Sequence, residues 1–162
     1  MKLIILWMAC SFTAVTIADA QDKAVSDFLG KERLSLLLDA DKTESYRIDW
    51  MKQSNDKGLG ISGFPILETG KALSKEQLKT LKNLISSPTS YEFQWSKRTL
   101  LRPSYSVRFI KGSDYVDILI DLESQQWGFS YKDNFVREDI SKTAMPVVIK
   151  ILETLFKNKE VQ

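Results

Sequence analysis

The residues of this chain that could do chemistry are its carboxylates, because the sequence has no His and one Cys. Without His, neither Ser-His-Asp nor Cys-His catalysis is available, and no zinc, haem or iron site can use imidazole. Asp117, Asp121 and Glu123 lie at even spacing on one face of a predicted strand. Carboxylates across a cleft can act as general acid and base on a glycan or bind a divalent cation. The interpretation we favour is a solvated strand face crossed by Arg108, as is usual in antiparallel sheets.

Two short motifs match catalytic or nucleotide-binding patterns but lie in an unsuitable context. Residues 58–63 read GLGISG, the GxGxxG fingerprint, yet Phe64-Pro65 and an extended segment follow where a helix should begin. Residues 54–57 read SNDK, the SxxK spacing, which needs a buried helix to lower the pKa of the Lys. Both matches fall in one polar, Gly-rich loop, so we interpret them as chance.

A basic and aromatic segment is the candidate binding surface. It comprises Trp95, Lys97, Arg98, Arg102 and Tyr105. Such a cluster can dock an acidic partner protein or an anionic envelope polymer through charge and stacking. The competing interpretation, which we favour for charge clusters in general, is a soluble connection between two strands.

Residues 1–20 have the features of a cleaved signal peptide. Met1-Lys2 supplies a positive start, residues 3–17 are mostly apolar, and Ala18-Asp19-Ala20 provides small residues for signal peptidase. The apolar run is too short for a bilayer-spanning helix. A lipoprotein anchored through Cys10 is the minority alternative, because Trp7 and Met8 fit a lipobox poorly. Cleavage after Ala20 leaves residues 21–162 as a single domain without cysteine, in the periplasm or outside the cell.

Composition narrows the class of partner. The chain has 162 residues, 23 Lys and Arg against 21 Asp and Glu, and 43% apolar residues. That length and apolar share suit one globular domain with one core. A net charge of +2 is too small to favour nucleic acid as the partner. We expect no cofactor and no metal site.

Periodicity predicts an α+β domain with an antiparallel sheet of about four to five strands packed by two to three helices. Strands are predicted at 46–50, 91–95, 105–111, 115–122 and 127–131, with extended chain at 61–67. Helices are predicted at 22–38, with a weak point at Gly30, at 73–86 and at 143–157.

Local signals define two helix starts and one hairpin. Ser74 and Gln77 form a predicted capping box, and Thr143 is the predicted N-cap of the last helix. In the hairpin around residues 112–115, pairing of Lys111 with Val116 aligns apolar residues with apolar residues.

The middle of the chain resembles a group of small exported bacterial proteins. The resemblance lies in residues 78–87, Tyr91-Glu92-Phe93, the segment LRPSYSVRF at 101–109, VDILI at 116–120, Phe156 and Tyr46-Arg47. It implies export but carries no assigned function. Several such proteins have cysteines that correspond here to Thr99-Leu100 and to residues 121–124, so no thiol or metal role is carried over.

Together these observations predict a non-catalytic binding protein of the bacterial envelope. Its partner would be another envelope or exported protein, and its role that of an accessory factor or of an immunity-type inhibitor. The alternative is a carboxylate-based hydrolase or a glycan-binding domain that acts on cell-wall polymer.

Overall fold

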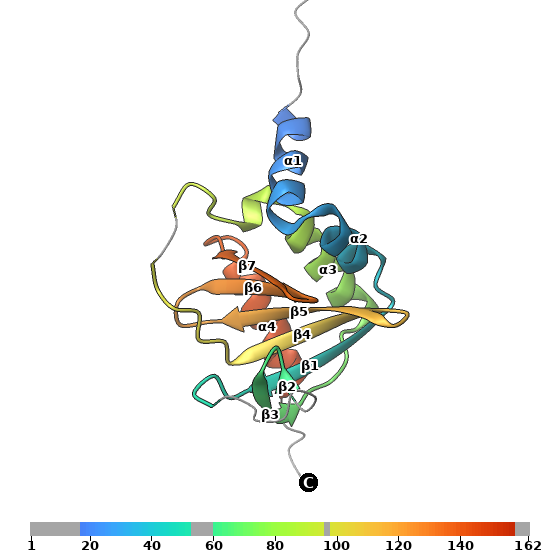
Figure 1. The fold of residues 1–162 in the computed structure, drawn as a ribbon, viewed down its shortest axis with the longest axis vertical. Coiled ribbons are helices and arrows are strands. Elements are labelled where there is room, and N and C mark those ends of the chain that lie inside the picture. The colour runs from blue at the N-terminus through green and yellow to red at the C-terminus, as the bar shows by residue number, and fades with distance from the viewer. Residues whose placement is uncertain (1–16, 53–59, 96–97, 158–162) are drawn as a thin grey trace, which may run out of the picture.

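The computed structural model describes residues 17–52, 60–95 and 98–157, which form four α-helices and seven strands (Figure 1). The helices are α1 (Ile17–Leu29), α2 (Lys31–Asp39), α3 (Lys75–Ser86) and α4 (Met145–Phe156), with a 3-10 turn, η1, at Pro88–Ser90. The strands are β1 (Lys42–Ile48), β2 (Gly60–Ile61), β3 (Phe64–Thr69), β4 (Tyr105–Lys111), β5 (Asp114–Asp121), β6 (Gln126–Tyr131) and β7 (Asn134–Asp139).

The strands form one antiparallel sheet, curved into a half-barrel, in the order β2-β3-β1-β4-β5-β6-β7. The predicted α+β class fits this architecture. The predicted size was wrong, because the described residues contain seven strands and four helices rather than four to five strands and two to three helices. Three local features distinguish the observed strands from the predicted ones.

The first is the β2–β3 hairpin, which replaces the single extended segment predicted at 61–67. Ser62 and Gly63 have φ values of 50° and 87°. Two consecutive residues at positive φ make the tight turn that joins antiparallel strands. Ile61 therefore pairs with Phe64, and the chain reverses where the apolar pattern alone suggests continuity.

The second is β7, whose polar sequence, Asn134 to Asp139, carries little apolar alternation. It is an edge strand of the sheet and pairs along its length with β6. An edge strand can be polar because much of its surface meets water. The pattern of apolar residues therefore did not predict it.

The third is the segment 91–95, where the predicted strand was wrong. Tyr91 forms a single bridge with Ile140, and Trp95 N–H then donates to the Glu92 carbonyl in a turn. The rings of Tyr91 and Phe93 stack at 5.0 Å. The alternating aromatic residues build an aromatic cluster with Phe28 rather than a strand.

The helix predictions held in outline. The helix predicted at 22–38 is two helices that meet at Gly30, whose φ of 78° breaks the regular backbone. The capping box of Ser74 and Gln77 at α3 is confirmed. At α4 the N-cap is Ala144 rather than Thr143, and the Ser141 hydroxyl accepts from the Ala144 N–H.

The register predicted for the β4–β5 hairpin was wrong by two residues. Lys111 pairs with Asp114, not Val116, because the loop contains just Gly112 and Ser113, and Gly112 has a φ of 59°. A shift of two residues leaves every side chain on its predicted face. It places Arg108 directly opposite Asp117, where the predicted register had it diagonal.

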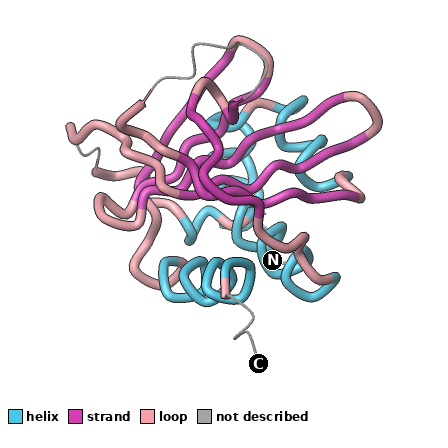
Figure 2. The backbone as a smooth tube through the Cα atoms, turned by 90° about the horizontal axis from the view of Figure 1, so that it is seen from below, coloured by secondary structure: helices cyan, strands magenta, loops and turns pink. Residues whose placement is uncertain are grey.

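The main hydrophobic core lies between the helices and one face of the sheet. In Figure 2 the helix that leads to the C-terminus packs beneath the curved strands. Val107, Phe109, Ile118, Trp127 and Phe129 of the sheet are fully buried in this core. The opposite sheet face is therefore the one left to form a site.

Candidate functional site

The sheet face opposite the core carries a smaller apolar cluster and a row of charged side chains. Successive strand residues point to opposite faces, so Ser106, Arg108 and Ile110 of β4 lie on this side. The small cluster contains Tyr46, Ile48, Ile61 and Leu119, with Phe64 and Leu101 against it. The β2–β3 hairpin contributes Ile61 and Phe64, and this places the hairpin over the open face.

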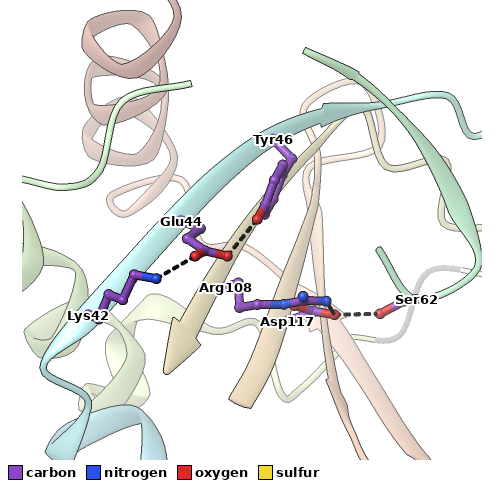
Figure 3. Close-up of polar contacts among 6 residues, drawn as sticks. All are labelled: Lys42, Glu44, Tyr46, Ser62, Arg108 and Asp117. Atoms are coloured by element: carbon purple, nitrogen blue, oxygen red, sulfur yellow. Dashed lines mark hydrogen bonds and ion pairs between the residues drawn. The ribbon is translucent and has the colours of Figure 1, made fainter. Parts of the chain in front are cut away.

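A buried ion pair lies at the centre of this face (Figure 3). Arg108 Nε and Nη2 donate to the two Asp117 carboxylate oxygens at 2.6 and 2.9 Å. The Asp117 side chain is 3% exposed and that of Arg108 is 19% exposed. The Ser62 hydroxyl donates to Asp117 Oδ2 at 3.3 Å, which ties the β2–β3 turn to β5.

A second polar group, on β1, extends this row. Lys42 Nζ donates to Glu44 Oε1 at 2.7 Å, and the Tyr46 hydroxyl donates to Glu44 Oε2 at 2.6 Å (Figure 3). The bond from Lys42, followed by that from Tyr46, lowers the Glu44 pKa. Burial alone would lower the Arg108 pKa, but its bonds to Asp117 and the charge of that carboxylate raise it overall. These four charged side chains thus form two satisfied pairs, Lys42 with Glu44 and Arg108 with Asp117.

Tyr46 is expected to make the free energy of unfolding decrease as the pH rises above about 10. Burial, and then its bond to Glu44, raise its pKa to about 12, above the usual value of about 10. The folded state binds the phenolic proton more tightly, so its contribution is complete below about pH 10 and is lost as pH rises toward 12. Urea unfolding of wild type and Tyr46→Phe over this range should show a smaller alkaline loss for the variant. The exposed Tyr115→Phe is the control, and an equal effect of both changes would contradict the assignment.

An open groove of about 470 Å³ lies beside the small apolar cluster. We call it the sheet groove. Its lining includes the apolar side chains Phe64, Leu100, Leu101, Leu119 and Phe135, with Ser62, Ser130, Lys132, Asp133, Asn134 and Arg137 as its polar residues.

Gly128 on β6 shapes the wall of this groove. A Cβ at that position would lie 2.5 Å from the Phe135 ring and 2.9 Å from Leu101 Cδ2. The absence of a side chain there lets both residues approach the sheet. Leu100 and Phe135 remain 69% and 47% exposed at the groove.

The basic and aromatic residues predicted as a binding surface have different surroundings in the described part of the chain. Trp95 is 75% exposed, Arg98 is exposed, and Lys97 lies outside the described residues. The Arg102 guanidinium lies over the Trp50 ring, 5.1 Å from its centroid. Tyr105 packs against Phe156 of α4 at 5.3 Å and so belongs to the helix side of the sheet.

The three predicted carboxylates occupy different environments. Asp117 belongs to the ion pair described above. Asp121 is 2% exposed and accepts from the N–H groups of Arg102, Glu123 and Ser124 and from the Ser124 hydroxyl, at 2.6 to 3.0 Å. Glu123 is exposed. Asp121 and Glu123 both line a second cavity, of about 340 Å³, with Arg102 and Thr99.

Sequence reasoning missed the sheet groove because its residues come from four separate segments. Phe64, Leu101, Leu119 and Phe135 have no common spacing in the chain. The one local signal is the glycine at 128 inside an otherwise aromatic strand, since Gly in a strand often marks a close approach of other atoms. No group of His, Cys, Asp and Glu in residues 17–52, 60–95 and 98–157 is arranged to hold a metal ion.

Comparison with known proteins identified no relative of this chain. A scan against models of protein families, a search of curated proteins and a search of solved structures each found no match to the chain. Among the described helices, none has the length and apolar character needed to cross a membrane. The geometry of the two cavities is therefore the basis for assigning a function.

Proposed function

We propose that the protein is a non-catalytic binding domain of the bacterial envelope and that the sheet groove holds a segment of a partner protein. The observation that carries the proposal is the groove itself, an apolar depression with exposed Leu100 and Phe135 at its edge. Exposed apolar residues gathered at a concave surface are typical of binding sites.

The size and composition of the groove favour apolar side chains of a partner. Its volume of about 470 Å³ is within the usual range for ligand sites, about 300 to 1,000 Å³. The lining has five apolar side chains and six polar ones, and among the polar ones Arg137 Nη1 donates to the Thr99 carbonyl at 3.0 Å. Aromatic and apolar anchors inserted into such pockets supply most of the binding energy at protein interfaces.

Export is part of this proposal. The core residues of α1, Val25 and Leu29, lie after Ala20 in the chain. Cleavage after Ala20 would therefore leave the core of the domain intact. The absence of cysteine after residue 20 is compatible with an oxidising compartment, since no thiol is left to react.

The alternative function, action on a cell-wall glycan, is favoured by one observation. Asp121 and Glu123 line a common cavity beside Arg102. However, both carboxylate oxygens of Asp121 already accept two hydrogen bonds each. These four donors occupy the acceptor positions of the carboxylate, which leaves none for a substrate proton, so the cavity suits glycan binding better than hydrolysis.

Site-specific crosslinking tests the binding function. The full chain carries the photoreactive residue p-benzoylphenylalanine at position 135 or, as the control, at Leu67, which is 61% exposed and does not line the groove. We expect irradiation in the native envelope to give one discrete protein adduct from position 135 and none from position 67. The adduct should disappear when the unlabelled wild-type chain competes for the partner and persist when Phe135→Lys competes.

Two results would contradict the proposal. Equal adduct patterns from positions 135 and 67 would show that the groove has no specific occupant. Capture of wall glycan that depends on Glu123 but not on Phe135 would favour the alternative function.

A further inference from the structure

Arg33 is a buried arginine whose charge has no carboxylate partner in the described part of the chain. The residue is 4% exposed. Its Nη2 donates to the side-chain and main-chain oxygens of Asn134 at 2.7 and 3.3 Å. Its Nε is buried and has no hydrogen-bond partner among residues 17–52, 60–95 and 98–157.

Such burial is unfavourable unless an anion is present. A buried charge is normally paired, because moving it out of water costs several kcal/mol. The carbonyl oxygens of Asn134 supply dipoles but no negative charge. Burial accordingly lowers the Arg33 pKa.

Arg33 also lines an open cavity at the junction of α1 and α2. The cavity has a volume of about 400 Å³. We call it the junction cavity, and its lining is Leu29, Gly30, Lys31, Glu32, Arg33, Tyr131, Lys132 and Asn134. Three of these side chains are cationic and one is anionic. Glu32 lies 4.0 Å from Lys132, so Arg33 and Lys31 remain as the cations without a carboxylate in the described residues.

The N-terminus of α2 opens into the same cavity. Gly30 is the N-cap, at a φ of 78°, and no side chain caps the nine-residue helix in the described structure. The first backbone N–H groups of a helix have no partner within the helix and carry a partial positive charge. Arg33 is the third residue of the helix, and its side chain leans back toward this end, as helical side chains do.

We propose that the junction cavity binds a small oxyanion group, a phosphate or a carboxylate, between the Arg33 guanidinium and the first backbone amides of α2. The ligand supplies the negative charge that Arg33 lacks and accepts from the free helix amides. Helix N-termini and arginine forks are the two protein groups best suited to such oxygens. The junction cavity adjoins the sheet groove, since Lys132 and Asn134 line both, but the proposal does not depend on the function of the groove.

The test is a titration of the full chain followed by amide NMR. Sodium phosphate and sodium acetate are the two probes, and sodium chloride at matched ionic strength is the reference. We expect saturable shifts with phosphate, acetate or both at the amides of residues 30–34, which do not line the sheet groove, and the difference identifies the preferred oxyanion. The amides of residues 75–77 are an internal control, because the capping box already satisfies the N-terminus of α3.

Variants distinguish anion binding by the Arg33 guanidinium from a general effect of salt. Arg33→Met should weaken binding by about tenfold or more, as expected for loss of a charged hydrogen bond. If that variant does not fold, Lys31→Gln serves, with an expected loss of about threefold. Lys75→Gln, at the same helix position of α3, should have no effect. Failure of both oxyanions to give a saturable shift in wild type, or unchanged affinity in Arg33→Met, would overturn the proposal.

Discussion

Replacing Asp117 with alanine is expected to lower the free energy of unfolding by about 3 to 5 kcal/mol. The change leaves the Arg108 guanidinium, whose side chain is 19% exposed, without its carboxylate. It also removes the acceptor of the Ser62 hydroxyl, one of the links between the β2–β3 turn and β5. Urea denaturation of wild type and variant measures the effect.

The double variant Arg108→Met, Asp117→Leu is the matched test of this explanation. Apolar replacement of a whole buried pair is often neutral, so we expect the double variant to recover to within about 1 kcal/mol of wild type. The exposed pair of Arg47 and Glu68, at 3.3 Å, provides the surface control. Glu68→Ala should cost less than about 1 kcal/mol. A cost for Asp117→Ala as small as that of Glu68→Ala would show that the pair does not hold the sheet face together.

Asp121→Ala is expected to lower the free energy of unfolding by about 3 kcal/mol. The Asp121 carboxylate accepts from two N–H groups of the turn between β5 and β6. It also accepts from the Arg102 N–H and so fixes the segment that leads into β4. Its removal leaves three partly buried N–H groups and the Ser124 hydroxyl without this acceptor. Chemical denaturation gives the loss, and faster hydrogen exchange at the amides of Arg102, Glu123 and Ser124 locates it.

Glu123→Ala is the control for Asp121, because Glu123 lies on the same turn but is exposed. We expect its free energy of unfolding to stay within about 0.5 kcal/mol of wild type. If Asp121→Ala were as stable as Glu123→Ala, the carboxylate would be free for another role, and the glycan alternative would gain support.

These two predictions bear on function as well as stability. Asp117 and Asp121 are two of the three carboxylates, with Glu123, whose spacing in the sequence suits catalytic or ligand-binding groups. Asp117 receives two bonds from Arg108 and one from Ser62, and Asp121 accepts four hydrogen bonds. Side chains so engaged organise the sheet. The proposed binding function therefore depends on apolar residues of the groove rather than on acids.

Local signals predicted several elements well. The capping box of Ser74 and Gln77 marks the start of α3 because it needs just four consecutive residues. The apolar stripe of α4 and the alternation in β4, β5 and β6 likewise follow from side chains within one element. Where alternation had another cause, as in the stacked rings of Tyr91 and Phe93, the same reasoning predicted a strand that does not form.

The sequence by itself determined the α+β class, most of the helices, the central strands and the faces of the β4–β5 hairpin. These depend on contacts between residues close in the chain or on the two-residue period of a strand. Only the tertiary structure decided the pairing of Arg108 with Asp117, the sheet groove and the junction cavity. The groove and the cavity join residues far apart in the chain, such as Arg33 and Asn134, and their approach depends on sheet curvature. The ion pair joins neighbouring strands and depends on the turn that sets their register. A shift of two residues in one hairpin preserves its pattern of apolar residues but changes which charges meet.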